Sequence, residues 1–333
     1  MILPVTRASG GGVSRPPSGT VDYLRMSVTD RCNFRCVYCM PPEGVGFRSP
    51  HEILRYEDMA FFVRVAVGVG ISKIRLTGGE PLVRKGVPDL VRLVKAVPGV
   101  RDVSLTTNGT LLPAFAAELA AAGLDRVNIS LDTLDPDRYR ALTRGGSLEE
   151  ALAGVDAALD YGFHPVKLNA VLMPQALSEL DAFVAMVRER PLHLRFIEWM
   201  PVGGCGPSTT GESVTKADAL AALARHGRLR PEPSPGGWGP ARYWRFPGHA
   251  GTIGFISSVS DHFCGECNRL RLTADGRLKS CLFSQDEIDV RGAVRARDVE
   301  ATLAAVRMSL GGKTYDKRVL PGRTQRGMSQ IGG

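Results

Sequence analysis

The stretch CNFRCVYC, residues Cys32 to Cys39, places three cysteines on one short segment in the spacing C-x3-C-x2-C. Three thiolates lie together there, and no fourth ligand is nearby in the sequence. A structural zinc site takes four ligands and usually pairs its cysteines as C-x2-C. A cubane iron-sulfur cluster held by three cysteines instead keeps one iron open to a ligand. The stretch therefore predicts a cluster that takes part in chemistry, with a zinc loop or unrelated buried cysteines as the alternative.

The composition is that of an ordinary soluble globular protein. The chain has 333 residues, of which 44% are hydrophobic, enough for one large α/β barrel with an extension or for two domains. The longest apolar stretch, residues 59–71, is interrupted by Arg64 and is shorter than the roughly 20 residues of a membrane span. No basic segment followed by a long apolar core begins the chain. We therefore expect a cytoplasmic protein.

Cysteine count and charge narrow the class further. Six of the seven cysteines fall into two tight groups, which favours metal binding in a reducing compartment over disulfides. The seventh, Cys205, is interpreted as an incidental thiol. The net charge of +8 fits a nucleic acid, an anionic small substrate or a basic surface. The basic residues are spread out without aromatic interleaving, which favours a polyphosphate substrate over DNA or RNA.

Residues 21–200 alternate between short β-rich runs and longer helical stretches. We predict strands over residues 24–29, 73–77, 102–107, 126–131, 165–172 and 193–199, and helices over 56–69, 87–97, 111–122, 148–161 and 177–190. This alternation predicts a parallel sheet with helices outside, and six units are too few to close a full barrel. Polar residues on the last strands indicate either a lined cavity or half-exposed strands. They are Lys167, Asn169, Arg195 and Glu198.

The two ends of the chain differ from this central part in their sequence patterns. Residues 1–20 are rich in glycine and proline and are interpreted as a flexible leader. Residues 201–333 are expected to form a C-terminal α+β domain, with a helix over 216–225 and strands over 241–246, 252–258, 269–273 and 277–283. Asp275-Gly276 predicts a hairpin between the last two strands.

A second group of cysteines lies in this C-terminal region. Cys264, Cys267 and Cys281 have the spacing C-x2-C-x13-C, which again provides three thiolates. A zinc site with His262 as the fourth ligand is the alternative, because C-x2-C pairs are typical of zinc. A second cluster is favoured, since His262 lies only two residues before Cys264 and the chain already contains one such motif.

The first motif resembles that of the radical S-adenosylmethionine (SAM) enzymes. Together with the second motif, the run CNRLR over residues 267–271 and the terminal Gly332-Gly333, it resembles the GTP 3',8-cyclase family of molybdenum cofactor biosynthesis. The resemblance extends from about Tyr23 to the last residue. It implies an incomplete (βα)6 TIM-like barrel of the radical SAM type with a C-terminal α+β extension. It also implies SAM and two 4Fe-4S clusters as cofactors, held by Cys32, Cys36 and Cys39 and by Cys264, Cys267 and Cys281.

The resemblance also implies the binding residues. SAM would contact Tyr38, Gly79 of the run TGGEP (residues 77–81), Ser130 and Met200. GTP would contact Arg25, Arg75, Thr106, Lys167, Arg269, Leu270 (through its backbone) and Arg271. Arg269 and Arg271 alternate on one strand, and guanidinium groups suit phosphate oxygens. The catalytic residues implied are Arg269, Arg271, Gly332 and Gly333, the two glycines being inserted into the active site.

The implied reaction begins with reductive cleavage of SAM. The resulting 5'-deoxyadenosyl radical takes hydrogen from C3' of the GTP ribose, C3' attacks C8 of guanine, and one electron and one proton complete the cyclic product. The implied partners are GTP, a reductant such as flavodoxin or ferredoxin, and a downstream cyclic pyranopterin monophosphate synthase. Neither a nucleic acid nor a membrane is expected, and homodimer and monomer both remain open.

Two other functions compete with this one. Another radical SAM enzyme with an auxiliary cluster, such as a peptide- or sulfatase-maturing enzyme, would share the first motif but carry more C-terminal cysteines. A zinc-stabilised nucleic-acid-binding protein is the alternative from another class. The chain departs from the cyclase pattern at Lys85-Gly86, where a basic residue followed by Asp is expected, and at Cys205.

Overall fold

The computed structural model describes residues 21–200, 202, 214–236, 239–314, 316, 324 and 326–332. The expected leader over residues 1–20, Cys205 and Gly333 lie outside the described residues. In the described part of the chain, no helix has both the length and the apolar character needed to cross a membrane.

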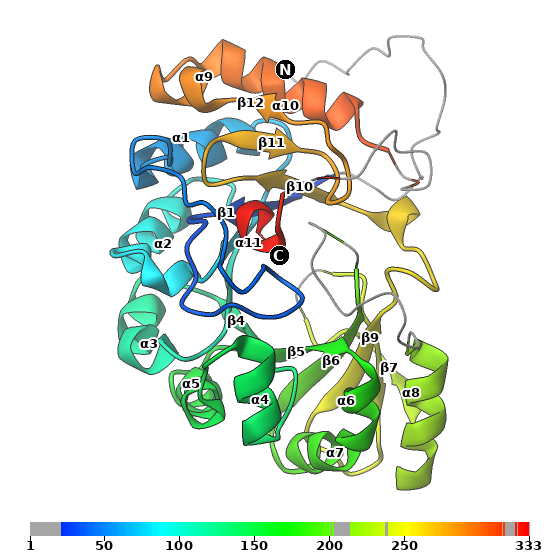
Figure 1. Ribbon diagram of the computed structural model, residues 1–333. Helices are drawn as coiled ribbons and strands as arrows, with labels where there is room; N and C mark the ends of the chain where they lie inside the picture. Colours follow the sequence, from blue (N-terminus) through cyan, green and yellow to red (C-terminus); the bar gives the residue numbers. More distant parts are fainter. Residues whose placement is uncertain are drawn as a thin grey trace.

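Six parallel strands form the centre of the molecule and pair in sequence order (Figure 1). They are β1 (Tyr23–Ser27), β2 (Lys73–Thr77), β3 (Asp102–Thr107), β4 (Arg126–Ser130), β5 (Val166–Leu172) and β6 (Leu192–Glu198). The predicted strands match these within two residues at each end. Their order and direction confirm an incomplete barrel of six βα units.

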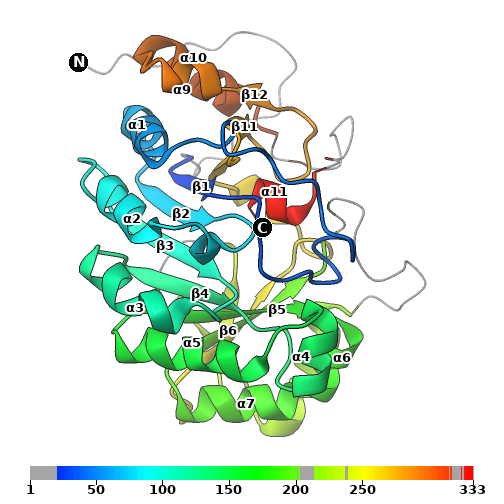
Figure 2. The same ribbon diagram turned by 60° about the vertical axis from the view of Figure 1, so that its left-hand side comes forward.

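Helices wrap around the outside of the curved sheet (Figure 2). They are α1 (Tyr56–Val67), α2 (Val87–Lys95), α3 (Leu112–Ala121), α4 (Pro136–Thr143), α5 (Leu148–Asp160), α6 (Pro174–Ser178) and α7 (Leu180–Glu189). The sequence did not predict α4, because only two of its residues, Tyr139 and Thr143, are buried and the apolar period is weak. The single helix predicted over residues 177–190 is wrong in detail, because α6 ends at Ser178 and α7 begins at Leu180.

The C-terminal strands continue the same sheet at both of its edges. At one edge β10 (Arg269–Leu272) pairs in parallel with β1 and is followed by β11 (Arg277–Lys279) and β12 (Ile288–Asp289). At the other edge β9 (Thr252–Ile256) pairs in parallel with β6 and is followed by β8 (Arg242–Arg245) and β7 (Arg230–Glu232). The division at residue 200 stays a prediction, and the sheet is continuous across it.

The predicted hairpin at Asp275-Gly276 joins β10 to β11, which are antiparallel. The remaining helices are α8 (Lys216–Leu223), α9 (Arg291–Arg295), α10 (Val299–Gly311) and α11 (Met328–Ile331). Both views place α11 at the open side of the barrel, near β1, so the end of the chain returns to the centre of the molecule.

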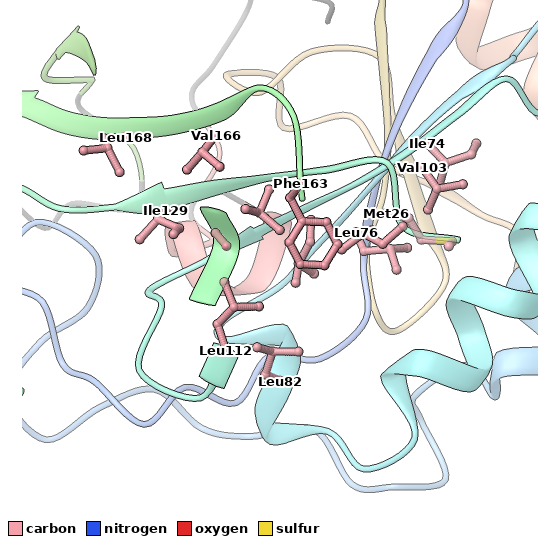
Figure 3. Close-up of a cluster of buried hydrophobic side chains, with 14 of the residues drawn as sticks. Met26, Ile74, Leu76, Leu82, Val103, Leu112, Ile129, Phe163, Val166 and Leu168 are labelled. Atoms are coloured by element: carbon pink, nitrogen blue, oxygen red, sulfur yellow. The ribbon is translucent and has the colours of Figure 1, made fainter. Parts of the chain in front are cut away.

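The strands divide their side chains between two environments. One set of alternate residues is apolar and packs under the helices, as Figure 3 shows for Met26, Leu76, Val103 and Ile129. Because neighbouring residues of a strand point to opposite faces, the other set faces the inside of the barrel. That inner set is mostly polar and charged, and it provides the walls of the site.

Candidate active site

A cavity of about 320 Å³ is lined by both groups of cysteines. The first group follows β1, and the second group flanks β10 and β11. The two groups are brought together because β1 pairs with β10, residues 23–26 with residues 269–272. Two motifs more than two hundred residues apart in the sequence therefore face one space.

The loop that carries the first cysteines is held by the end of α4. The backbone N–H groups of Arg35 and Val37 donate to the carbonyls of Thr143 and Leu142, at 3.0 and 2.9 Å. Arg144, directly after α4, donates through Nη1 to the Arg35 carbonyl at 2.9 Å. The loop thus keeps Cys32, Cys36 and Cys39 half-buried at the cavity wall.

The TGGEP run packs directly against this cysteine loop. A Cβ atom on Gly79 would lie 2.2 Å from the Arg31 carbonyl oxygen, so only glycine permits this approach. The next residue, Glu80, is buried, and its carboxyl group accepts hydrogen bonds from Thr107 Oγ1 at 2.8 Å and the Asn108 backbone N–H at 2.7 Å. Burial raises the pKa of Glu80 to about 7, against the lowering effect of these hydrogen bonds.

Tyr38 is oriented by a carboxylate that the sequence analysis did not single out. Its hydroxyl donates to Asp132 Oδ2 at 2.5 Å, while Asp132 Oδ1 accepts from the Val171 backbone N–H at 2.8 Å. Burial, followed by the Asp132 charge, raises the pKa of Tyr38 well above its ordinary value. Ser130 and Met200, predicted for SAM, also line the cavity.

The second cysteine group lies on a short turn and at the end of β11. The Cys267 backbone N–H donates to the Cys264 carbonyl at 3.1 Å. Burial opposes ionisation of the Cys267 thiol, but the nearby cations of Lys313 and Arg269 outweigh it and lower its pKa. In the first group, by contrast, burial raises the pKa of Cys32 to about 11.

A zinc ion and a cubane cluster need different arrangements of the cysteines. Among the residues that the structure describes, no three cysteine, histidine or carboxylate groups converge closely enough to hold one metal ion. Zinc needs all its ligands on one centre, whereas a cubane attaches each thiolate to a different iron. His262, the suggested fourth zinc ligand, places its Nδ1 at 3.0 Å from the Ser258 carbonyl oxygen.

Positive charge is concentrated inside the barrel. Arg25 pairs in register with Arg75 on one side and with Arg271 on the other, so three guanidinium groups lie on neighbouring strands of one face. Burial and the neighbouring cations lower the pKa of Lys167 to about 6, and burial is the main cause that lowers those of Arg75 and Arg271 to about 10. Such charge is unfavourable without an anion, so the cavity is built for one.

Several polar atoms at the cavity wall have no hydrogen-bond partner among the described residues. They are Thr106 Oγ1, Asn169 Oδ1 and Arg195 Nε, on β3, β5 and β6. Buried polar atoms are nearly always hydrogen-bonded in native proteins. These atoms are therefore available to a polar ligand in the cavity.

The end of the chain lies among the arginines. The Gly332 carbonyl oxygen accepts from Arg271 Nη1 at 2.6 Å and from Arg25 Nε at 3.4 Å. Gly332 has a φ of +72°, and a Cβ atom on it would lie 2.5 Å from Thr77 Cγ2. The position therefore requires glycine for both conformation and space.

The structure brings together most of the predicted site residues. The six cysteines, Tyr38, Gly79, Ser130, Met200, Arg25, Arg75, Thr106, Arg269 and Arg271 line the cavity. Leu270 is fully buried on the opposite face of β10, so only its backbone could contact a ligand. Lys167 is not among the residues that line the cavity; it lies two residues before Asn169 on β5, and its ammonium group donates to the Gly236 carbonyl. Asp132 was missed, although a polar residue just after a predicted strand was a usable signal.

Two known protein families match this chain, and a solved structure has a similar fold. Residues 26–187 match the family described as Radical SAM superfamily, and residues 192–317 match the family described as Molybdenum Cofactor Synthesis C. The fold is similar to that of Streptococcus suis SuiB bound to S-adenosylmethionine, with a TM-score of 0.61 and 14% identity over 85% of this chain and 65% of that one. The barrel and the cysteine loop after β1 thus define a radical SAM protein.

Curated relatives narrow the assignment. A GTP 3',8-cyclase of Pelotomaculum thermopropionicum is 51% identical over 94% of this chain and 98% of its own length. A GTP 3',8-cyclase of Heliobacterium modesticaldum is 49% identical over the same shares of the two chains. The chain belongs to the GTP 3',8-cyclase family, which favours the cyclase over the maturase and zinc-protein alternatives.

Proposed function

We propose that this chain cyclises GTP to (8S)-3',8-cyclo-7,8-dihydroguanosine 5'-triphosphate, the first step of molybdenum cofactor biosynthesis, with SAM and two 4Fe-4S clusters. The observation that carries the proposal is one cavity lined by two separate groups of three cysteines and by a row of buried arginines. A binding protein for nucleic acid would need its cations on an exposed surface. The arginines of this row instead line an internal cavity.

The SAM side is assigned to the loop after β1 and the ends of β2 and β4. A cluster held by Cys32, Cys36 and Cys39 would supply the electron that cleaves SAM to a 5'-deoxyadenosyl radical. Gly79 lines the cavity beside this loop, and we assign it to a polar group of SAM. Tyr38, fixed by Asp132, provides a ring of defined orientation beside the cysteines.

The GTP side is assigned to the arginine row and the second cysteine group. Arg25, Arg75, Arg269 and Arg271 would neutralise the triphosphate, and the low dielectric around them strengthens this attraction. Thr106, with its unpartnered Oγ1, offers a hydroxyl on the neighbouring wall. A second cluster on Cys264, Cys267 and Cys281 would hold the guanine through its open iron. The ribose would then lie between the two halves of the cavity.

The end of the chain is assigned to closure of the site. Gly332 lies against Arg271 and Arg25, with Thr77 too close for any side chain. We propose that Gly332 and Gly333 exclude water and fix the arginines for the reaction. Extending the chain beyond Gly333 should abolish cyclisation while both clusters remain, and full activity of such a protein would disprove this role.

The proposal also includes an electron donor and an enzyme that uses the product. A low-potential reductant such as flavodoxin or ferredoxin would supply electrons, and a cyclic pyranopterin monophosphate synthase would consume the product. Two clustered groups of cysteines suit the reducing cytoplasm, where we place the protein.

Metal analysis of the anaerobically reconstituted protein tests the proposal. About eight irons with matching sulfide per chain are expected, and about four in each variant that replaces one cysteine group by alanine. The contrary result is about four irons and one zinc per chain, with the zinc lost when Cys264, Cys267 and Cys281 are replaced. The second group would then bind zinc instead of a guanine-binding cluster, and the cyclase assignment would be refuted.

A further inference from the structure

Lys313 is a buried lysine that the sequence analysis did not connect with the site. It lies two residues after α10 and is 7% exposed. Its ammonium group is within hydrogen-bonding distance of Cys267 Sγ at 3.4 Å, the Arg269 carbonyl at 2.8 Å and the Ser280 carbonyl at 2.7 Å. An ammonium group carries three N–H donors in a tetrahedral arrangement, so it can contact acceptors on separate segments.

The three acceptors lie on two different segments of the second cysteine group. Cys267 lies two residues before β10 and Arg269 is the first residue of that strand, whereas Ser280 directly precedes Cys281. Lys313 therefore links the segment of one cysteine to the segment of another. Arginine would not reproduce this contact, because its donors lie in one plane whereas those of an ammonium group are tetrahedral.

We propose that Lys313 is a positioning residue for the second iron-sulfur cluster, which sets the separation of Cys267 and Cys281 and stabilises the reduced cluster through its charge. The proposal rests on the proposed function, because it requires a cluster on this cysteine group. It goes further by assigning control of the reduction potential to a residue outside the ligand set.

The charge of Lys313 acts on the reduction potential of the second cluster. A cubane with three thiolate ligands is anionic and gains another negative charge on reduction. A cation hydrogen-bonded to a ligating sulfur favours the more negative state, and burial keeps water from screening the charge. Removing the charge should therefore lower the reduction potential. A role confined to packing would leave the potential unchanged.

The experiment isolates the second cluster. In a chain whose Cys32, Cys36 and Cys39 are replaced by alanine, reconstituted protein is titrated with dithionite and followed by electron paramagnetic resonance. Lys313→Gln keeps donors for the two carbonyls but removes the charge. We expect a more negative potential, with the ratio of reduced to oxidised cluster at fixed poise falling roughly tenfold.

Two further variants complete the test. Lys313→Met, which also removes the carbonyl contacts, should lose iron as well, and Lys313→Arg should keep a potential near the wild type with reduced iron content. Lys95→Met is the control, since Lys95 is a half-buried lysine at the end of α2 whose ammonium group donates to the Asp125 carboxylate at 2.7 Å, away from the second cysteine group. Its potential should be unchanged.

The outcomes separate the two proposals. An unchanged potential in Lys313→Gln at full iron content overturns the role of Lys313 and leaves the second cluster intact. If the parent chain with an intact Lys313 binds no cluster at Cys264, Cys267 and Cys281, the proposed function fails, and the role of Lys313 fails with it. If Lys313→Met does not fold, as judged by circular dichroism, Lys313→Gln alone decides.

Discussion

Replacing Gly332 by alanine should release the end of the chain from the cavity. The left-handed backbone at Gly332, with φ of +72°, costs an L-residue about 1–2 kcal/mol. The new methyl group would also lie 2.5 Å from Thr77 Cγ2, and such overpacking costs about 1–3 kcal/mol. The lower end of this sum, about 2 kcal/mol, corresponds to a roughly 30-fold shift toward the released state.

Gly327→Ala is the matched control within the same segment. A Cβ atom there would meet the Cys39 carbonyl oxygen at 3.5 Å and Val45 Cγ1 at 3.9 Å, which are ordinary contacts, and its φ of −65° suits alanine. Hydrogen-deuterium exchange of residues 326–332 is the assay, with cyclisation rate and iron content measured alongside. We expect faster exchange and loss of cyclisation in Gly332→Ala only, at full iron content. Equal exchange in the two variants would refute the reasoning.

Three other predictions follow from the contacts. Because the pKa of Lys167 is lowered to about 6, this side chain is a neutral amine in the free protein at pH 8. The unfolded chain then binds one more proton than the folded protein, so the free energy of unfolding should rise with pH above about 6. GTP binding to the wild type should take up a proton, and GTP binding to Lys167→Met should not. Calorimetry in buffers of different ionisation enthalpy measures this, and no uptake in the wild type would contradict it. Gly154→Ala would place Cβ 2.2 Å from the Gly109 carbonyl oxygen, so its free energy of unfolding in urea should fall by at least about 1–3 kcal/mol. Gly292→Ala, with open space around the new methyl group, should gain up to about 1 kcal/mol. Equal effects of the two substitutions would disprove this packing argument. Arg326→Gln removes two 3.1 Å hydrogen bonds to the Asp275 carboxylate and should speed amide exchange of the chain end roughly tenfold, and unchanged exchange would exclude this anchoring role.

The sequence predicted the central barrel because its signals are local. Each of the six strands is a short run rich in β-branched and other apolar residues, and Gly78, Pro165 and Pro191 directly flank three of the strand ends. The pairing of β1 with β10 and of β6 with β9 could not be predicted this way. These contacts join residues such as Tyr23 and Arg269, and no local pattern records which distant strand completes an edge.

In the active site, too, local patterns could be predicted from the sequence and contacts between distant segments could not. The cysteines were visible because a cluster requires several ligands at close spacing. The position of Asp132 just after a strand was a usable signal, but its hydrogen bond to Tyr38 was not predictable, and neither was the contact of Lys313 with Cys267, because the fold brings these pairs together from distant segments. The orientation of Leu270, away from the cavity, follows from strand alternation and could have been predicted from Arg269 and Arg271 beside it.

The central claim is that one cavity joins SAM cleavage to cyclisation of GTP. The most direct test uses GTP with deuterium at C3', together with SAM, dithionite and anaerobically reconstituted protein, and analyses both products by mass spectrometry. The account predicts that 5'-deoxyadenosine gains the deuterium and that the cyclised nucleotide forms in equal amount. Cleavage of SAM without deuterium in the 5'-deoxyadenosine, and without a cyclised nucleotide, would contradict it.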